Sequence, residues 1–120
     1  MKVGVIGQRD FRGKLYDNYL YVEEILDSYL PNLTAVVSGG GKGIESLAQK
    51  WAEKNGKAVE VVRPNFSLYS MQEAFHYRNS EIVQQADCLL IFWDGNDANP
   101  MGPASQAIKS GKQVEFVPMV

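Results

Sequence analysis

Four glycines in five positions are the most distinctive chemical feature of this 120-residue sequence. They lie in Ser38-Gly39-Gly40-Gly41-Lys42-Gly43, directly before a helical pattern. Consecutive glycines let the backbone approach a ligand and aim several N–H groups at one anion, and the dipole of a following helix adds to that attraction. The loop is not a Walker A sequence, because Gly43-Ile44 replaces the required Lys-Ser/Thr step. We expect phosphate or ribose contact here rather than a flexible turn, with Glu45 either accepting from a ribose hydroxyl or favouring the first helical turn.

Two further segments carry arginines that suit a phosphate. Gly7-Gln8-Arg9 follows the first apolar run, and a guanidinium binds phosphate through two N–H groups at once; the alternative is a surface arginine paired with Asp10. Arg78-Asn79 lies on a helical pattern, opposite the charged face expected of a solvated helix. We expect Arg9 and Arg78 to neutralise phosphate, and we interpret the single histidine, His76, as a structural or surface residue.

The end of the apolar run 88–93 and the segment that follows it hold an aromatic ring, two carboxylates and a second candidate anion site. Trp93 is a candidate to stack on a base, the alternative being a residue at the edge of the core. Asp94 and Asp97 are candidate acid/base groups or cation ligands, although such polar residues are common in turns. Gly102 and Ser105, around the start of a short helix, are candidates for a second anion contact.

These loops need a sheet to bring them together. Helical periodicity alternates with β-branched runs, which we expect as strands over 2–6, 34–38, 58–63, 86–93 and 113–117. The expected helices are 15–30, 44–54, 71–85 and 104–109. Near-continuous apolar strands are typical of a parallel sheet covered on both faces. We therefore predict one α/β domain over residues 1–120, a Rossmann-like three-layer domain with a mostly parallel five-stranded sheet and ligands at the carboxyl ends of its strands.

Composition limits the classes of partner. The formal net charge is −2 and basic residues are scattered, so we expect no nucleic-acid partner. One cysteine, Cys88, excludes an internal disulfide and favours a reducing compartment. No apolar run is long enough to span a bilayer, which predicts a cytoplasmic protein without a membrane partner. The lack of a second histidine or cysteine leads us to expect no metal and no cofactor.

Three motifs in order give the sequence a resemblance to a known superfamily. They are Gly7-Gln8-Arg9-Asp10-Phe11, then Ser38-Gly39-Gly40-Gly41-Lys42-Gly43-Ile44-Glu45 with Leu47-Ala48 and Trp51-Ala52, and then Arg78-Asn79. Together they resemble the SLOG superfamily, which includes the Lonely-Guy phosphoribohydrolases and the DprA-type proteins, and are most similar to its small YspA-like branch. The resemblance implies a Rossmann-like fold that binds nucleotides, nucleotide sugars or related ligands in a groove formed by these loops.

One departure from the superfamily bears on catalysis. Where its hydrolases carry a catalytic glutamate, this sequence has Gln106, a neutral amide that cannot take up a proton as a carboxylate does. We therefore favour a sensor, carrier or sequestering module for a phosphate-bearing nucleotide or nucleotide derivative. The alternative is a nucleotide N-glycosidase that releases base from a ribose phosphate, with Glu45, Asp94 and Asp97 as candidate catalytic carboxylates. A single-stranded DNA role, by analogy with DprA, is disfavoured by the acidic charge balance.

The aromatic residues of the first helix suggest self-association. Tyr16, Tyr19, Tyr21 and Tyr29 present more large apolar surface than one helix face can bury. We expect a homo-oligomer, a dimer or larger. The alternative is that the tyrosines cap the core while their hydroxyl groups stay in water.

Overall fold

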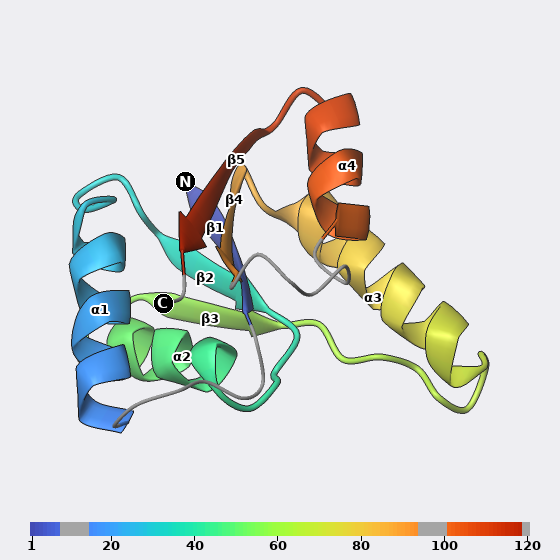
Figure 1. Cartoon of the computed structure of the whole chain (residues 1–120), viewed down its shortest axis with the longest axis horizontal. Helices are drawn as coiled ribbons and strands as arrows, with labels where there is room; N and C mark the ends of the chain where they lie inside the picture. Colours follow the sequence, from blue (N-terminus) through green and yellow to red (C-terminus); the bar gives the residue numbers. More distant parts are fainter. Residues whose placement is uncertain (8–14, 94–100, 119–120) are drawn as a thin grey trace.

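A five-stranded parallel sheet with helices on both faces forms the body of the protein in a computed structural model that describes residues 1–7, 15–93 and 101–118 (Figure 1). Its elements, in chain order, are β1 (Lys2–Gly7), α1 (Leu15–Asp27), β2 (Ala35–Ser38), α2 (Ile44–Lys54), β3 (Ala58–Val61), α3 (Met71–Gln85), β4 (Cys88–Trp93), α4 (Met101–Lys109) and β5 (Gln113–Pro118). The strand order is β3-β2-β1-β4-β5, and every pairing is parallel. The predicted three-layer, Rossmann-like α/β fold is confirmed.

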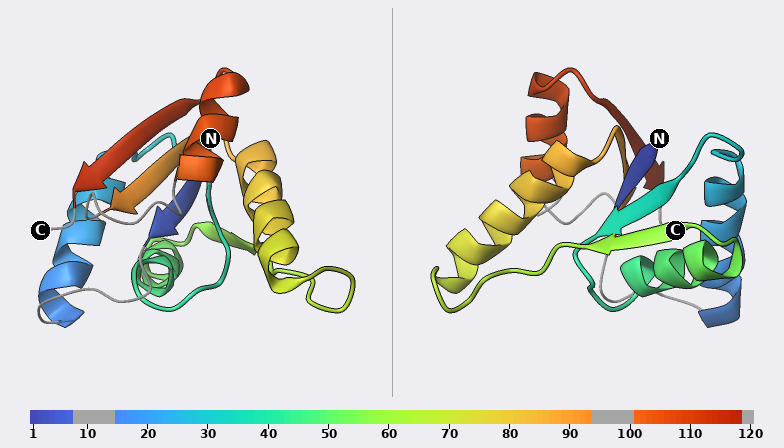
Figure 2. Two further views of the ribbon diagram at one scale, coloured as in Figure 1. Left: turned by 45° about the vertical axis from the view of Figure 1, so that its right-hand side comes forward. Right: turned by 180° about the vertical axis from the view of Figure 1, so that it is seen from behind.

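Each face of the sheet buries its own hydrophobic cluster. Helices α1 and α2 cover one face and α3 and α4 the other, as the two views of Figure 2 show. Along β4, Leu90 and Phe92 join the cluster under α1 and α2, whereas Leu89 and Ile91 join the cluster under α3 and α4. Because side chains alternate between two buried faces, the strand reads as a continuous apolar run in the sequence.

Helix ends differ from the sequence-based boundaries for local reasons. Helix α1 stops at Asp27, because the N–H groups of Ser28 and Tyr29 bond carbonyls three residues back and tighten the chain before Pro31. Helix α4 begins earlier than expected, at Met101, and includes Pro103. A proline is tolerated there because the first four N–H groups of a helix have no partner within it.

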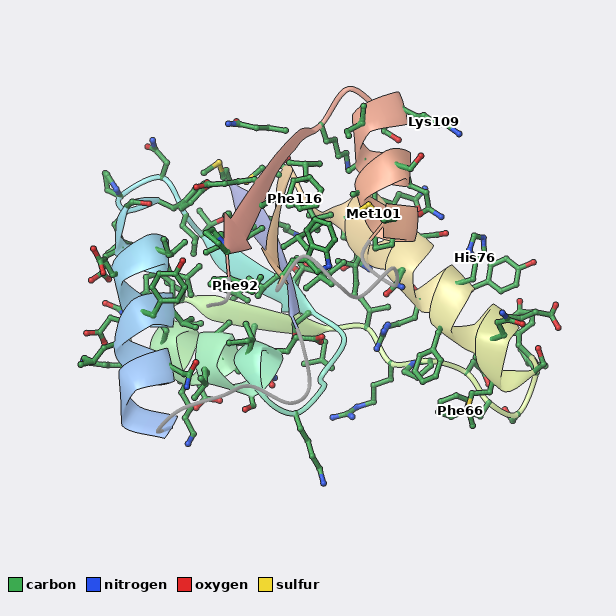
Figure 3. The ribbon with its side chains drawn as sticks, in the orientation of Figure 1. Phe66, His76, Phe92, Met101, Lys109 and Phe116 are labelled. Carbon is green, nitrogen blue, oxygen red and sulfur yellow. The ribbon has the colours of Figure 1, made fainter. Side chains whose placement is uncertain are left out.

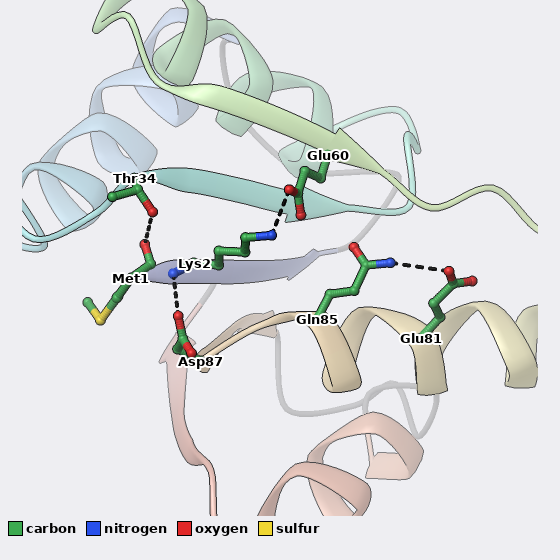
Figure 4. Close-up of polar contacts among 7 residues, drawn as sticks. All are labelled: Met1, Lys2, Thr34, Glu60, Glu81, Gln85 and Asp87. Atoms are coloured by element: carbon green, nitrogen blue, oxygen red, sulfur yellow. Dashed lines mark hydrogen bonds and ion pairs between the residues drawn. The ribbon is translucent and has the colours of Figure 1, made fainter.

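The amino-terminal edge of the sheet is held by polar contacts (Figure 4). The backbone N–H of Lys2 donates to Asp87 Oδ2 at 2.6 Å, and the hydroxyl of Thr34 donates to the carbonyl of Met1 at 3.1 Å. The Lys2 ammonium pairs with Glu60 at 2.8 Å. The first two contacts lie at the edge opposite to the carboxyl ends of the strands, where the candidate ligand loops lie, and the ion pair spans β2 to reach β3.

Three tyrosines of α1 and of the turn after it pack on the core. Tyr19, Tyr21 and Tyr29 pack against the cluster beneath this helix. The hydroxyl of Tyr21 donates to the carbonyl of Pro118 at 2.8 Å, and that of Tyr29 donates to the carboxylate of Glu115. Packing against the core accounts for these three rings, and β5 holds the hydroxyl groups of Tyr21 and Tyr29. The side chain of Tyr16 lies outside the described ones, and the homo-oligomer stays a prediction. None of the helices in the described ranges is long and apolar enough to span a membrane.

Candidate functional site

The glycine-rich segment after β2 wraps around a carboxylate of the chain itself. Glu45, in the first turn of α2, is 8% exposed, and its Oε1 accepts from the N–H groups of Gly39 at 3.0 Å and Gly41 at 3.3 Å. The backbone of Gly7, at the end of β1, also favours the charged form of this carboxylate and so lowers its pKa slightly. Amides that the sequence offers to a phosphate therefore already bind an anion, which an incoming phosphate would have to displace.

The same carboxylate has a perturbed acidity. Burial raises the pKa of Glu45 above its ordinary value, while the amides of Gly41 and Gly39 and the positive charge of Arg78 oppose that rise. Desolvation exceeds the stabilisation by these donors, because the amides and the guanidinium replace only part of the lost hydration.

Two arginines lie against the glycine turn. A Cβ atom on Gly39 would stand 2.5 Å from Nη1 of Arg78, and one on Gly40 would stand 3.4 Å from Nη1 of Arg63. Gly40 also has a φ of +72°, which favours glycine. The absence of side chains at these two positions lets guanidinium groups from α3 and from the end of β3 approach the same turn.

Within residues 1–7, 15–93 and 101–118, neither arginine forms a close ion pair. The ion pairs among the described residues are Lys2–Glu60 and Lys54–Glu23. Arg78 donates from Nε to Asn79 Oδ1 at 3.1 Å and lies over the ring of Phe75, with 5.1 Å between its Cζ and the ring centroid. In the described part of the chain, Arg78 interacts with Glu45 only at longer range, and no close carboxylate engages its guanidinium.

A groove of about 400 Å³ lies beside Arg78, between α3 and α4. Its walls are Gln72, Phe75, His76, Arg78 and Asn79 from α3, with Gly102, Pro103 and Gln106 from α4. The volume is within the usual range for small-molecule sites, roughly 300–1,000 Å³. Figure 3 shows the two helices side by side, with His76 on α3 and Met101 at the start of α4. The groove thus unites the Arg-Asn motif with Gly102 and with the glutamine that replaces a glutamate.

The structure brings together only some of the residues predicted for the site. Ser38 is buried, and its hydroxyl accepts from the N–H of Gly40 at 3.3 Å; Lys42 is exposed, and Gly43 is the N-terminal cap of α2. Ser105 is exposed and Trp93 packs 5.6 Å from the ring of Phe116; neither lines the groove. Gln8, Arg9, Asp94 and Asp97 lie outside the described residues.

The sequence analysis missed Arg63 and Phe75 as site residues. Arg63 stands two residues after the end of β3, and a cation at the carboxyl end of a predicted strand was a usable signal. Phe75 gave no comparable signal, because a ring on a helix is most often part of the core. Across residues 1–7, 15–93 and 101–118, no three His, Cys, Asp or Glu side chains cluster as metal ligands would.

A family model described as the YspA, cpYpsA-related SLOG family matches residues 1–69, which is 69 of the 120 residues. The chain belongs to this family. The match covers β1 to β3 and includes the glycine loop and Glu45, whereas Arg78 and Gln106 lie beyond it. The resemblance inferred from the sequence motifs is confirmed, and membership of this SLOG family supports a nucleotide-related role. No curated protein matches the sequence.

Solved structures share the fold of this SLOG chain at low sequence identity. DprA from Streptococcus pneumoniae has a TM-score of 0.76 and 18% identity, over 98% of this chain and 50% of its own. DprA from Helicobacter pylori has a TM-score of 0.67 and 18% identity, over 100% of this chain and 66% of its own. The protein TM1055 has a TM-score of 0.65 and 20% identity, over 94% of this chain and 71% of its own. The SLOG chain thus spans half the length of the pneumococcal DprA chain.

These neighbours correct one expectation about partners. The Helicobacter pylori DprA is described by its single-stranded DNA binding mode. Excluding a nucleic-acid partner for this SLOG chain was therefore wrong. The error lies in arguing from total charge, because a nucleic-acid strand meets a local surface. Arg63 and Arg78, which have no close ion pair among the described residues, share one turn of a chain whose net charge is −2.

Proposed function

We propose that the protein binds a phosphate-bearing nucleotide or nucleotide derivative in the groove between α3 and α4, as a sensor, carrier or sequestering module. The observation that carries this proposal is the composition of the groove. Arg78 supplies a guanidinium that no described carboxylate pairs closely, Phe75 and His76 supply ring faces, and Asn79 and Gln106 supply amides. A cation, flat apolar surface and neutral hydrogen-bonding groups match phosphate, base and ribose in turn.

The phosphate is placed against Arg78 rather than in the amides of the glycine loop. Glu45 already accepts from two of those amides, and a second anion beside its carboxylate would be repelled. The N-terminal turn of α4 adds a favourable dipole at the groove, where Gly102 lines the wall. The role proposed for Gly39 is to leave space for Arg78.

Binding without turnover follows from Gln106. The amide of this residue lines the groove and can donate and accept hydrogen bonds, but it cannot serve as a general acid or base as a carboxyl group does. The alternative function, a nucleotide N-glycosidase, would need a carboxylate at the ligand. No described residue that lines the groove carries a carboxylate, and that of Glu45 is buried and engaged by backbone amides. The candidates Asp94 and Asp97 lie outside the described residues.

The test is a thermal-shift screen with nucleoside mono-, di- and triphosphates, ADP-ribose, NAD and cyclic nucleotides, followed by chromatography for released base. A ligand at 100 times its Kd stabilises the fold by about 2.7 kcal/mol, which raises Tm by roughly 10 °C or more for a domain of this size. We expect such a shift with one or more of these compounds, and no released base. Released base would favour the glycosidase instead.

Two variants locate the site. Arg78→Met removes the guanidinium, and Gly39→Ala puts a Cβ atom 2.5 Å from Arg78 Nη1, so that the end of this side chain must move. Both should reduce the ligand-induced shift, whereas Lys50→Ala, on the exposed side of α2, should leave it unchanged. A full shift in Arg78→Met, or no shift with any compound in the native protein, would refute the proposal.

A further inference from the structure

An exposed aromatic surface continues from the groove onto the segment before α3. Residues 66–77 hold six of the twelve large hydrophobic side chains that are exposed among the described residues: Phe66 (55%), Leu68 (72%), Tyr69 (38%), Met71 (70%), Phe75 (39%) and Tyr77 (50%). Figures 1 and 2 show this loop and the first turns of α3 projecting beyond the sheet, and Figure 3 places Phe66 on the projection. An apolar patch of this kind marks an interaction site.

The rings of this surface are ordered by contacts among themselves. Phe66 and Phe75 meet edge to face, with centroids 5.5 Å apart and an interplanar angle of 82°. The ring centroids of Tyr69 and Tyr77, on the same segment, lie 4.5 Å apart. The loop is held in turn by Ser70, which caps α3 and whose hydroxyl donates to the carboxylate of Glu73 at 2.8 Å. Exposed rings fixed in this way lose little conformational entropy when a flat partner stacks on them.

Two cations border the rings. Arg78 lies over Phe75, and Arg63 and Arg78 lie against neighbouring glycines of one turn. From Val61 to Asn79 the charged residues are these two arginines and Glu73, and the carboxylate of Glu73 is engaged by the hydroxyl of Ser70. The surface formed by Arg63, Phe66, Phe75 and Arg78 is therefore cationic and aromatic, on a chain that is acidic as a whole.

We propose that the surface of Arg63, Phe66, Phe75 and Arg78 binds single-stranded nucleic acid, with unpaired bases stacked on the rings and phosphates on the arginines. Rings combined with guanidinium groups match a single strand, whose base faces and phosphates are both open; in a duplex the base faces are hidden. A second copy of the chain fits less well. A two-fold interface on this surface would bring four guanidinium groups together, with no close acidic partner among the described residues.

The surface goes beyond the proposed nucleotide site, because Arg63 and Phe66 do not line the groove that a single nucleotide would fill. The two sites share Phe75 and Arg78. A strand lying on the outer surface would thus reach the groove with one nucleotide, and the variants that distinguish the two proposals are those at Arg63 and Phe66.

The experiment is fluorescence anisotropy of the full chain with labelled oligothymidylate of about 12 nucleotides, a length within the ~4–16 nucleotides covered by comparable single-strand sites. Phe66→Ala should weaken binding by about 5- to 100-fold, which corresponds to the loss of one stacked base. Arg63→Ala should weaken binding and lower the slope of log affinity against log salt by about 0.7, as expected for one lost phosphate contact. Leu20→Ala on α1 (42% exposed) and Lys50→Ala on α2 are the matched controls and should bind as the native protein does.

Several results would overturn the inference: no oligonucleotide binding at low salt, unchanged affinity in both Phe66→Ala and Arg63→Ala, or equal affinity for a duplex. Self-association that Phe66→Ala abolishes, without oligonucleotide binding, would assign the surface to a second copy. Thermal shifts with mononucleotides separate this outcome from failure of the proposed function. Phe66→Ala and Arg63→Ala should keep those shifts. If an oligonucleotide binds but no mononucleotide does, only the proposed nucleotide site in the groove is refuted.

Discussion

Replacing Glu45 with alanine should destabilise the protein and open an anion site. The change removes the acceptor for the N–H groups of Gly39 and Gly41, of which the first bond is buried and the second partly buried. A buried donor without a partner costs about 1–3 kcal/mol, and a partly buried one recovers some of that from water. Removing a carboxylate whose pKa is raised by burial returns part of its desolvation cost. We expect a net loss of about 2 kcal/mol.

Urea denaturation and thermal unfolding measure this loss. A decrease of about 2 kcal/mol should lower Tm by roughly 10 °C in a domain of this size. Glu53→Ala is the matched control, because Glu53 lies on the same helix but is exposed, and a surface change of this kind stays within about 0.5 kcal/mol.

Rescue by a free anion tests whether the amides of Gly39 and Gly41 form an anion site once Glu45 is removed. Sulfate or phosphate should raise the Tm of Glu45→Ala by more than it raises that of the native protein or Glu53→Ala, because the free anion can accept from the amides that Glu45 has left. A Glu45→Ala variant as stable as the native protein would refute the energetic argument. Equal stabilisation of all three proteins by sulfate would show that the freed amides do not form an anion site.

Two further predictions concern acidity and the end of α3. Because burial raises the pKa of Glu45 above 4.5, the folded state binds more protons than the unfolded state between that value and the folded pKa; the contribution of this group to stability is therefore present at low pH and is lost as pH rises through the folded pKa. The free energy of unfolding of the native protein relative to Glu45→Gln should accordingly increase as pH falls from 7 towards 4.5, and a constant difference would contradict this. The ammonium of Lys112 donates to the carbonyls of Val83 at 2.5 Å, Gln84 at 2.9 Å and Ala86 at 2.7 Å, so Lys112→Met should cost about 2 kcal/mol by urea denaturation, with Lys109→Met, on the exposed end of α4, as a neutral control.

Much of the fold is determined by local sequence patterns. The apolar run from Cys88 to Trp93 is buried on both faces, and that is a property a strand of a parallel sheet must have wherever it lies in the sheet. The glycine loop, the Arg-Asn pair and Gln106 were also recognisable from the sequence, because each motif is defined by residue types at fixed spacing. The coarse fold and the family followed from these patterns.

Tertiary structure alone decided how the candidate residues are used. Glycine spacing shows that amides can bind an anion, but the buried carboxylate of Glu45 is the anion they bind, and its burial depends on the packing of α2 against β1 and β2. From the sequence, the tyrosines of the first helix could belong to an interface or to the core. The strand order places β5 where it accepts a hydrogen bond from Tyr21. Arg63 and Arg78 are 15 positions apart in the sequence, and they reach one turn because β3 pairs with β2 while α3 crosses the opposite face of the sheet from α2. Charge, burial and proximity between distant segments depend on these packing geometries, so the sequence could nominate the groups but could not say which of them meet.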